Sequence, residues 1–191
     1  MPTSVVNKCR IYAMRIRFLI ERMAMMICLS VQGMAVVHAQ QPKRELPFSI
    51  DSIPKIEIAV ELIKKYEGMH RDSTCFPYYG YGHCLLPGEK LSYGMTEAEA
   101  EALLRKDLAV RYKLFRKFGK NALLLTVLSY NVGQGVLLGH GGHPKSKLVR
   151  KLEAGNRDIY REYVAYCRYK GKIVRSIERR RKMEFLLLYE P

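Results

Sequence analysis

A short segment in the first half of the chain concentrates residue types that could do acid–base chemistry. It reads EGMHRD over residues 67–72, and PYYGYGH follows over residues 77–83. We expect Glu67 at the C-terminal end of a helix, where the negative end of the helix dipole disfavours an ionised carboxylate. Partial burial beneath a following hairpin would act in the same direction, and a carboxyl kept protonated is what a general acid requires. Taken by itself, the residue is better explained as an exposed glutamate at a helix end.

The elements around this segment can be predicted from local patterns. Ile56, Ala59, Val60 and Ile63 repeat at helical spacing, which predicts a helix from Pro54 to Tyr66 with a stop at Gly68. Residues 73–91 are rich in aromatic residues, glycine and proline, which indicates a short β hairpin or small sheet.

Helices dominate the remainder of the predicted fold. Thr96-Glu97-Ala98-Glu99 is a capping box that opens a helix through Phe118, ended by Gly119. The other predicted elements are a helix over 122–132 capped by Asn121, a glycine-rich loop over 133–142, a helix over 145–154, a helix from Asn156 through Tyr169, and a helix from Ser176 through Tyr189. The expected fold class is α+β, mostly α, in one domain over residues 54–191.

The order of these motifs resembles a known family. A helix ending in Glu-Gly, then a hairpin ending in Gly-Tyr-Gly-His, resembles the phage-type lysozymes (glycoside hydrolase family 24, the endolysins and muramidases). The resemblance continues through MTEAEAEALLRKDL (95–108), SYNVGQG (129–135), KLVRKLEAG (147–155) and residues 169–188, and covers about residues 58–189. It implies a lysozyme-like fold, Glu67 as the catalytic acid and no metal or organic cofactor. The implied reaction is hydrolysis of the β-1,4 bond between N-acetylmuramic acid and N-acetylglucosamine in peptidoglycan.

One spacing departs from the family pattern. The family places a catalytic Asp nine residues after the Glu and a Thr six residues further, whereas here the segment is about four residues shorter. Counting back from the Gly-Tyr-Gly-His motif puts Asp72 at the Asp position and Tyr78 at the Thr position, with Thr74 out of register. Asp72 is therefore either the base that activates water or a turn residue.

Four further side chains are candidates for substrate binding. Tyr78 and Tyr81 could line a sugar cleft with their aromatic faces, although alternation on a half-buried strand turns some of these tyrosines inward. His83 could bind substrate, but the resemblance favours a structural role. The resemblance also suggests that Asn131 faces the cleft. Residues 179–181 are three arginines, for which we expect a solvated helix face.

Two other functions stay open at this point. A lytic transglycosylase needs a single carboxylate, which Glu67 would supply, so the altered spacing of Asp72 makes this a serious alternative. An inactive cell-wall-binding protein could keep the fold without the reaction. A nucleic-acid-binding or membrane-disrupting protein is suggested by charge alone and lacks a motif.

The N-terminal segment predicts export. Basic residues run from Met14 to Arg22, an apolar stretch follows from Met23 to Val37, and Val37-His38-Ala39 precedes Gln40, in the order of a signal peptide. An uncleaved anchor helix is the alternative, although the stretch is short for a membrane span. We expect a signal peptide over 1–39, a linker over 40–53, and a periplasmic or extracellular monomer that acts on peptidoglycan, without nucleic acid and without stable membrane insertion.

Charge and cysteines refine this expectation. The chain of 191 residues has a net charge of +15, and loss of residues 1–39 would leave about +11, which favours an anionic partner such as the cell wall. In an oxidising compartment Cys75 and Cys84 could form a bridge across the hairpin, or they could be free together with Cys167. The spacing of cysteine and histidine does not suggest a zinc site.

Overall fold

The computed structural model describes residues 53–191. The predicted signal peptide and nearly all of the predicted linker lie outside these residues. Within the described part, no helix combines the length and the apolar character that crossing a membrane requires.

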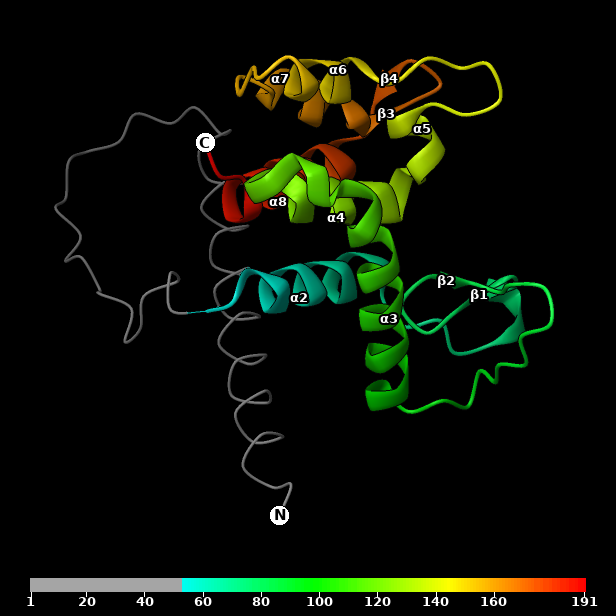
Figure 1. The fold of residues 1–191 in the computed structure, drawn as a ribbon. Coiled ribbons are helices and arrows are strands. Elements are labelled where there is room, and N and C mark those ends of the chain that lie inside the picture. The colour runs from blue at the N-terminus through cyan, green and yellow to red at the C-terminus, as the bar shows by residue number, and fades with distance from the viewer. Residues whose placement is uncertain (1–52) are drawn as a thin grey trace, which may run out of the picture.

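The described chain is mostly helical and carries two short hairpins (Figure 1). The α-helices are α2 (Lys55–Glu67), α3 (Glu97–Phe115), α4 (Ala122–Val132), α5 (Gln134–Leu138), α6 (Lys147–Glu153), α7 (Tyr160–Val164) and α8 (Arg175–Leu188). The 3₁₀ segments are η2 (Ser73–Cys75), η3 (Arg116–Asn121) and η4 (Ala165–Cys167), and the strands are β1 (Tyr78–Tyr79), β2 (His83–Cys84), β3 (Arg168–Tyr169) and β4 (Lys172–Ile173).

Helix α2 forms where the sequence predicted it and ends at Glu67. Residues 58–63 are all buried, so this part of the helix is covered on every side, whereas Ile56 of the predicted apolar stripe is 39 % exposed. Gly68 then takes a φ of 69°, a left-handed conformation that a residue with a Cβ rarely adopts. The chain therefore leaves the helix immediately after the candidate acid.

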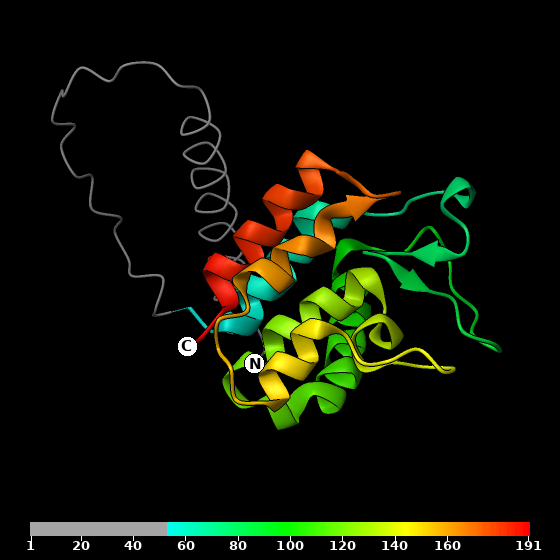
Figure 2. The ribbon, with the colours of Figure 1, turned by 90° about the horizontal axis from the view of Figure 1, so that it is seen from above.

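The segment after α2 folds back onto the β1–β2 hairpin. The two strands are antiparallel, with Tyr78 opposite Cys84 and Tyr79 opposite His83. The backbone N–H of His70 donates to the carbonyl of Gly80 at 2.7 Å, so the chain just past Glu67 pairs with the hairpin turn. The predicted hairpin is confirmed, and Figure 2 shows it projecting to one side of the helical body.

Helices α3 and α4 connect the hairpin to the other helices. Thr96 and Glu99 form the predicted capping box at the start of α3. Helix α4 packs against α2, α3 and α8 (Figures 1 and 2), and most of its residues are buried. The ends of α2 and α4 and one face of α8 are thereby brought to the side from which the β1–β2 hairpin projects.

Several predicted boundaries are wrong. The predicted loop over 133–142 contains helix α5. The helix predicted to run from Asn156 through Tyr169 starts only at Tyr160 and ends at Val164, because Asn156 accepts the N–H of Asp158 in a local turn and a β hairpin begins at Arg168. Ser176 lies inside α8 and does not cap it. Asn121 precedes α4, but its amide donates to the carbonyl of Glu190 and does not cap the helix.

Candidate active site

Two donors converge on one oxygen of Glu67. Arg180 Nη1 donates to Glu67 Oε1 at 2.7 Å, and Asn131 Nδ2 donates to the same oxygen at 3.3 Å. The Glu67 side chain is 21 % exposed, so the carboxyl is fixed but accessible. Its other oxygen, Oε2, has no partner among the described residues.

Arg180 lies within a buried charge network. Its Nε donates to Glu184 Oε1 at 2.9 Å, Arg181 donates to the same oxygen at 3.0 Å, and the Tyr163 hydroxyl donates to Glu184 Oε2 at 2.8 Å. Burial alone would lower the pKa of Arg180, but the carboxylates of Glu184 and Glu67 raise it above its usual value. Arg180 therefore stays charged and holds the two carboxylates at fixed positions.

The burial of Arg180 and Arg181 corrects the prediction of a solvated arginine face. Arg180 is 6 % exposed and Arg181 is fully buried. The same helix face carries Met183, Leu187 and Leu188, all in the core. Residues three and four apart on a helix share a face, so the stripe of Met183 and Leu187 continues to Arg180. This spacing was the sequence signal that could have predicted the burial of Arg180.

The turn of the β1–β2 hairpin lies directly against Glu67. Gly82 has a φ of +96°, and a Cβ placed on it would lie 3.7 Å from Glu67 Cγ and 3.5 Å from the Tyr130 ring. The Tyr130 hydroxyl donates to the carbonyl of Tyr81 at 3.0 Å and ties the hairpin to α4. A residue with a side chain at position 82 would therefore be strained and would fill the space beside the carboxyl.

Asn131 and Asp72 occupy different positions relative to Glu67. Asn131 is exposed near the end of α4 and donates to Glu67, and its contact with substrate stays a prediction. Asp72 caps η2: it accepts the Thr74 N–H at 2.9 Å and also the Thr74 hydroxyl. The hydroxyl bond and then the backbone bond hold the pKa of Asp72 below its ordinary value. Asp72 thus forms a turn with Thr74 and is exposed as a carboxylate.

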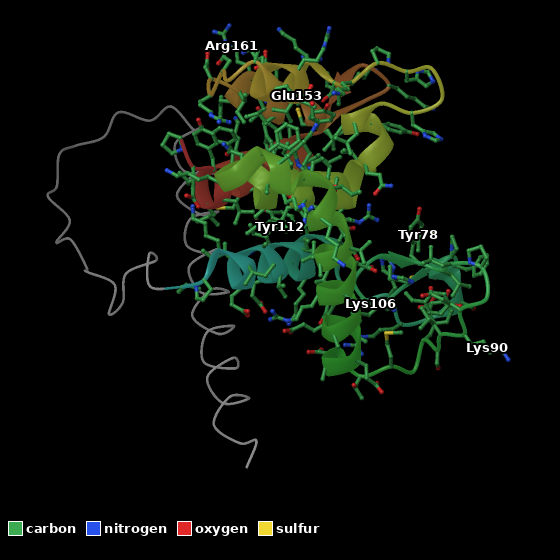
Figure 3. All side chains as sticks on the ribbon, viewed as in Figure 1. Tyr78, Lys90, Lys106, Tyr112, Glu153 and Arg161 are labelled. Atoms are coloured by element: carbon green, nitrogen blue, oxygen red, sulfur yellow. The ribbon has the colours of Figure 1, made fainter. Side chains whose placement is uncertain are left out.

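The predicted sugar-binding tyrosines divide between surface and core. Tyr78 is 46 % exposed and stands out from the hairpin (Figure 3), with its ring at an edge-to-face angle to His70. Tyr81 is only 5 % exposed, with Lys64 Nζ 5.5 Å from its ring centre. Tyr78 remains a candidate for substrate contact, whereas the prediction that the Tyr81 side chain lines the site is corrected.

His83 is a buried link between hairpin and helix. Its Nδ1 lies 2.8 Å from Asp107 on α3, and its Nε2 lies 2.7 Å from Glu89 in the loop after β2. Burial would lower the pKa of His83, but the bonds to Glu89 and Asp107 raise it above its usual value. With 5 % of its surface exposed, His83 is not placed to contact substrate, so the structure corrects the prediction of substrate binding and favours the structural role.

The cysteines give no bridge in the described part of the chain. Cys75, Cys84 and Cys167 are free, so the alternative with free thiols is the one that the structure contains. Among residues 53–191, histidine, cysteine and carboxylate side chains do not gather into a group that could hold a metal ion.

Comparisons with known proteins identify the family. The model of the phage lysozyme family matches residues 64–184, so the chain belongs to this family of peptidoglycan hydrolases. The fold is similar to the muramidase domain of SpmX from Asticaccaulis excentricus, at 22 % identity and a TM-score of 0.53, over 70 % of this chain and 95 % of that chain. Comparison with curated proteins gave no match. The predicted lysozyme-like α+β fold is confirmed.

Proposed function

We propose that the protein hydrolyses the glycan strands of bacterial peptidoglycan at the β-1,4 bond between N-acetylmuramic acid and N-acetylglucosamine, with Glu67 as the general acid. Membership in the phage lysozyme family supports the substrate class. The observation that carries the assignment of the acid is the asymmetric environment of the Glu67 carboxyl, in which one oxygen accepts two hydrogen bonds and the other accepts none.

This asymmetry suits proton donation. Oε1 can remain an acceptor from Arg180 and Asn131 while Oε2 carries the proton. The donors thus fix the carboxyl without occupying the oxygen that would protonate the glycosidic leaving group. Gly82 brings no side-chain atoms against Glu67, whose Cγ would lie 3.7 Å from a Cβ at that position.

Asp72 is our candidate for the second carboxylate. Its lowered pKa leaves it ionised at neutral pH, as a residue that activates water or forms a covalent intermediate must be. Inversion by an activated water needs a carboxyl separation of roughly 6.5–9.5 Å and retention about 5–5.5 Å. The anomeric configuration of the first product, followed by NMR, would therefore distinguish these two roles for Asp72.

A lytic transglycosylase is the second candidate. The observation that favours it is the engagement of Asp72 with Thr74 in the η2 turn, which gives this carboxylate a structural explanation of its own. In that reaction the 6-hydroxyl of the muramic acid attacks the anomeric carbon of the same sugar. Glu67 alone would donate a proton to the leaving glycosidic oxygen and then accept the proton of the 6-hydroxyl.

Location and assembly are part of the proposal. We place the protein in the periplasm or outside the cell because the proposed substrate is the cell wall and the first 39 residues have the order of a signal peptide, and we expect it to be a monomer. The net charge of +15 would favour approach to an anionic wall.

Digestion of purified peptidoglycan by the whole chain tests the function. We expect soluble fragments that end in a reducing N-acetylmuramic acid, identified by borohydride reduction and mass spectrometry. Fragments that end in 1,6-anhydromuramic acid would show the transglycosylase. Intact glycan after prolonged incubation with folded protein would contradict both reactions.

A further inference from the structure

A basic cavity lies on the side of α8 that faces away from Glu67. Its volume is about 360 Å³, and it is lined by α7, η4, the β3–β4 hairpin and α8. Glu178 and Lys182 of α8 line it, whereas Arg180, midway between them, points to Glu67. Residues two positions apart on a helix face nearly opposite directions, so the cavity is separate from the candidate active site.

The cavity has an excess of positive charge. Arg161, Arg168 and Lys182 line it, and Glu178 is the acidic residue among the lining side chains. The bond from Lys182 and then that from Arg175 hold the pKa of Glu178 below its ordinary value, so this carboxylate is already paired.

The two arginines are left available for an external anion. Arg161 is exposed and makes no ion pair with a described residue, and Arg168 donates only to the carbonyl of Gly171, at 3.0 Å. The neighbouring carboxylate of Glu162 is held by Lys147 at 3.1 Å and by Lys151 at 2.9 Å, so it does not neutralise Arg161. Figure 3 shows Arg161 on the outer side of α7, far from Tyr78.

Apolar and aromatic surface completes the lining. Val164 and Ile173 contribute aliphatic groups, and Ile173 is 43 % exposed. The Tyr160 ring is held by an edge-to-face contact with Phe185, with 5.2 Å between ring centres, and is also 43 % exposed. A fixed, accessible aromatic ring beside guanidinium groups suits a ligand that has both a ring with C–H faces and an anionic group.

We propose that this cavity is an accessory site for a phosphorylated saccharide. Arg161 and Arg168 would bind the phosphate, with the paired Lys182 and Glu178 beside them, and Tyr160 would pack against the sugar. The volume lies within the range of small-ligand sites. Such a group could belong to a phosphodiester polymer of the cell wall or to a phosphorylated glycolipid of an outer membrane. The site goes beyond the proposed reaction and does not require Glu67.

Binding of N-acetylglucosamine 1-phosphate to the whole chain, measured by isothermal titration calorimetry, tests the proposal. We expect this probe to bind at least about tenfold more tightly than inorganic phosphate or N-acetylglucosamine alone. Arg161→Gln with Arg168→Gln should weaken binding at least tenfold. Lys113→Gln with Arg116→Gln removes the same charge from exposed positions on α3 and η3 and should leave binding unchanged. Tyr160→Ser should reduce the preference for the sugar phosphate over phosphate.

Equal loss in both double variants, or equal affinity for phosphate and the sugar phosphate, would overturn the proposal, because either would indicate non-specific attraction. Tighter binding of duplex DNA through the same arginines would also overturn it. Cosedimentation with walls that carry a phosphodiester polymer and with vesicles that carry lipopolysaccharide then identifies the source, and retention by neither would count against the site. Cleavage of an unphosphorylated glycan is expected to be the same in all these variants, so failure of the reaction and failure of the site are distinguishable.

Discussion

Arg180 Nη1 lies 2.7 Å from Glu67 Oε1, across 113 positions of the chain. The guanidinium is anchored on its other side by Glu184, so Glu67 is positioned by a residue that is itself fixed in the core. The ion pair between Arg180 and Glu67 thus joins the end of α2 to the middle of α8. The orientation of the candidate acid is therefore a property of the packed helices and not of the flexible glutamate side chain.

Glu67→Gln should abolish measurable glycan cleavage. The glutamine amide keeps the size of the side chain and an oxygen for Arg180, but it has no proton to transfer, and a general acid typically contributes about 10²–10⁴-fold. Release of reducing fragments from peptidoglycan is the measurement. Glu97→Gln, at an exposed position paired with Arg71, is the matched control and should be fully active. Near-normal cleavage by folded Glu67→Gln would contradict the assignment.

Asp72→Asn separates charge from turn formation. Asparagine caps turns as well as aspartate does, so the η2 turn with Thr74 should persist while the charge is lost. If Asp72 acts on water, the loss of activity should be comparable to that of Glu67→Gln. Because the pKa of Asp72 is lowered, the wild-type protein should keep this carboxylate ionised down to acidic pH. Protonation of Asp72 should then cause the fall in wild-type activity on the acidic side of the pH profile, and the residual activity of the variant should lack this fall. Activity close to wild type, with anhydro products, would instead support the transglycosylase.

Arg180→Lys tests the positioning of Glu67. A single ammonium cannot reproduce the two separate donors that now contact Glu67 and Glu184. We expect kcat to fall at least about tenfold with little change in KM, because misplaced catalytic groups slow the chemical step. Steady-state kinetics on soluble glycan fragments measure both constants. Arg116→Lys at an exposed position is the control, and an unchanged kcat in Arg180→Lys would remove Arg180 from this role.

His83 should make stability depend on pH. The pKa of His83 is raised above its ordinary value of 6.5, so the contribution of the imidazolium is fully present below about pH 6.5 and is lost as pH rises through the raised pKa. At pH 6, His83→Gln should lower the free energy of unfolding by about 1–3 kcal/mol, as expected for hydrogen bonds to charged groups. The difference from wild type should shrink in alkaline solution. Denaturant unfolding at several pH values measures it, and a difference that is constant with pH would contradict the ionic link.

Export predicts a defined mature N-terminus. Cleavage after Ala39 would leave Gln40 as the first residue. Mass spectrometry of the N-terminal peptide of the protein recovered from the periplasm or medium is the measurement, because an N-terminal glutamine can cyclise to pyroglutamate and block Edman degradation. A protein retained in the cytoplasm with its N-terminal segment intact would contradict the signal peptide.

The sequence alone determined the elements whose signals are local. Thr96 and Glu99 fix the start of α3 because both capping hydrogen bonds form within four residues. Gly68 ends α2 because glycine adopts a positive φ by its own local preference, without a contact from elsewhere in the chain. The place of Glu67 at a helix end, before an aromatic hairpin, followed from these two kinds of signal together with the order of the motifs.

Tertiary structure decided which charged and aromatic side chains are inside. An arginine triplet predicts a solvated surface, yet Arg180 and Arg181 are buried. Glu184, about one turn further along α8, compensates both arginines, and Glu67 approaches Arg180 from the end of α2. Tyr78 and Tyr81 have the same chemistry, but Tyr81 lies in the core, with Lys64 near its ring and the Tyr130 hydroxyl bonded to its carbonyl, whereas Tyr78 is 46 % exposed. The spacing of Glu184 from the two arginines is visible in the sequence, but the covering of this helix face by the rest of the core and the approach of Glu67 from α2 are not, because burial of a charge depends on partners that only the folded chain brings together.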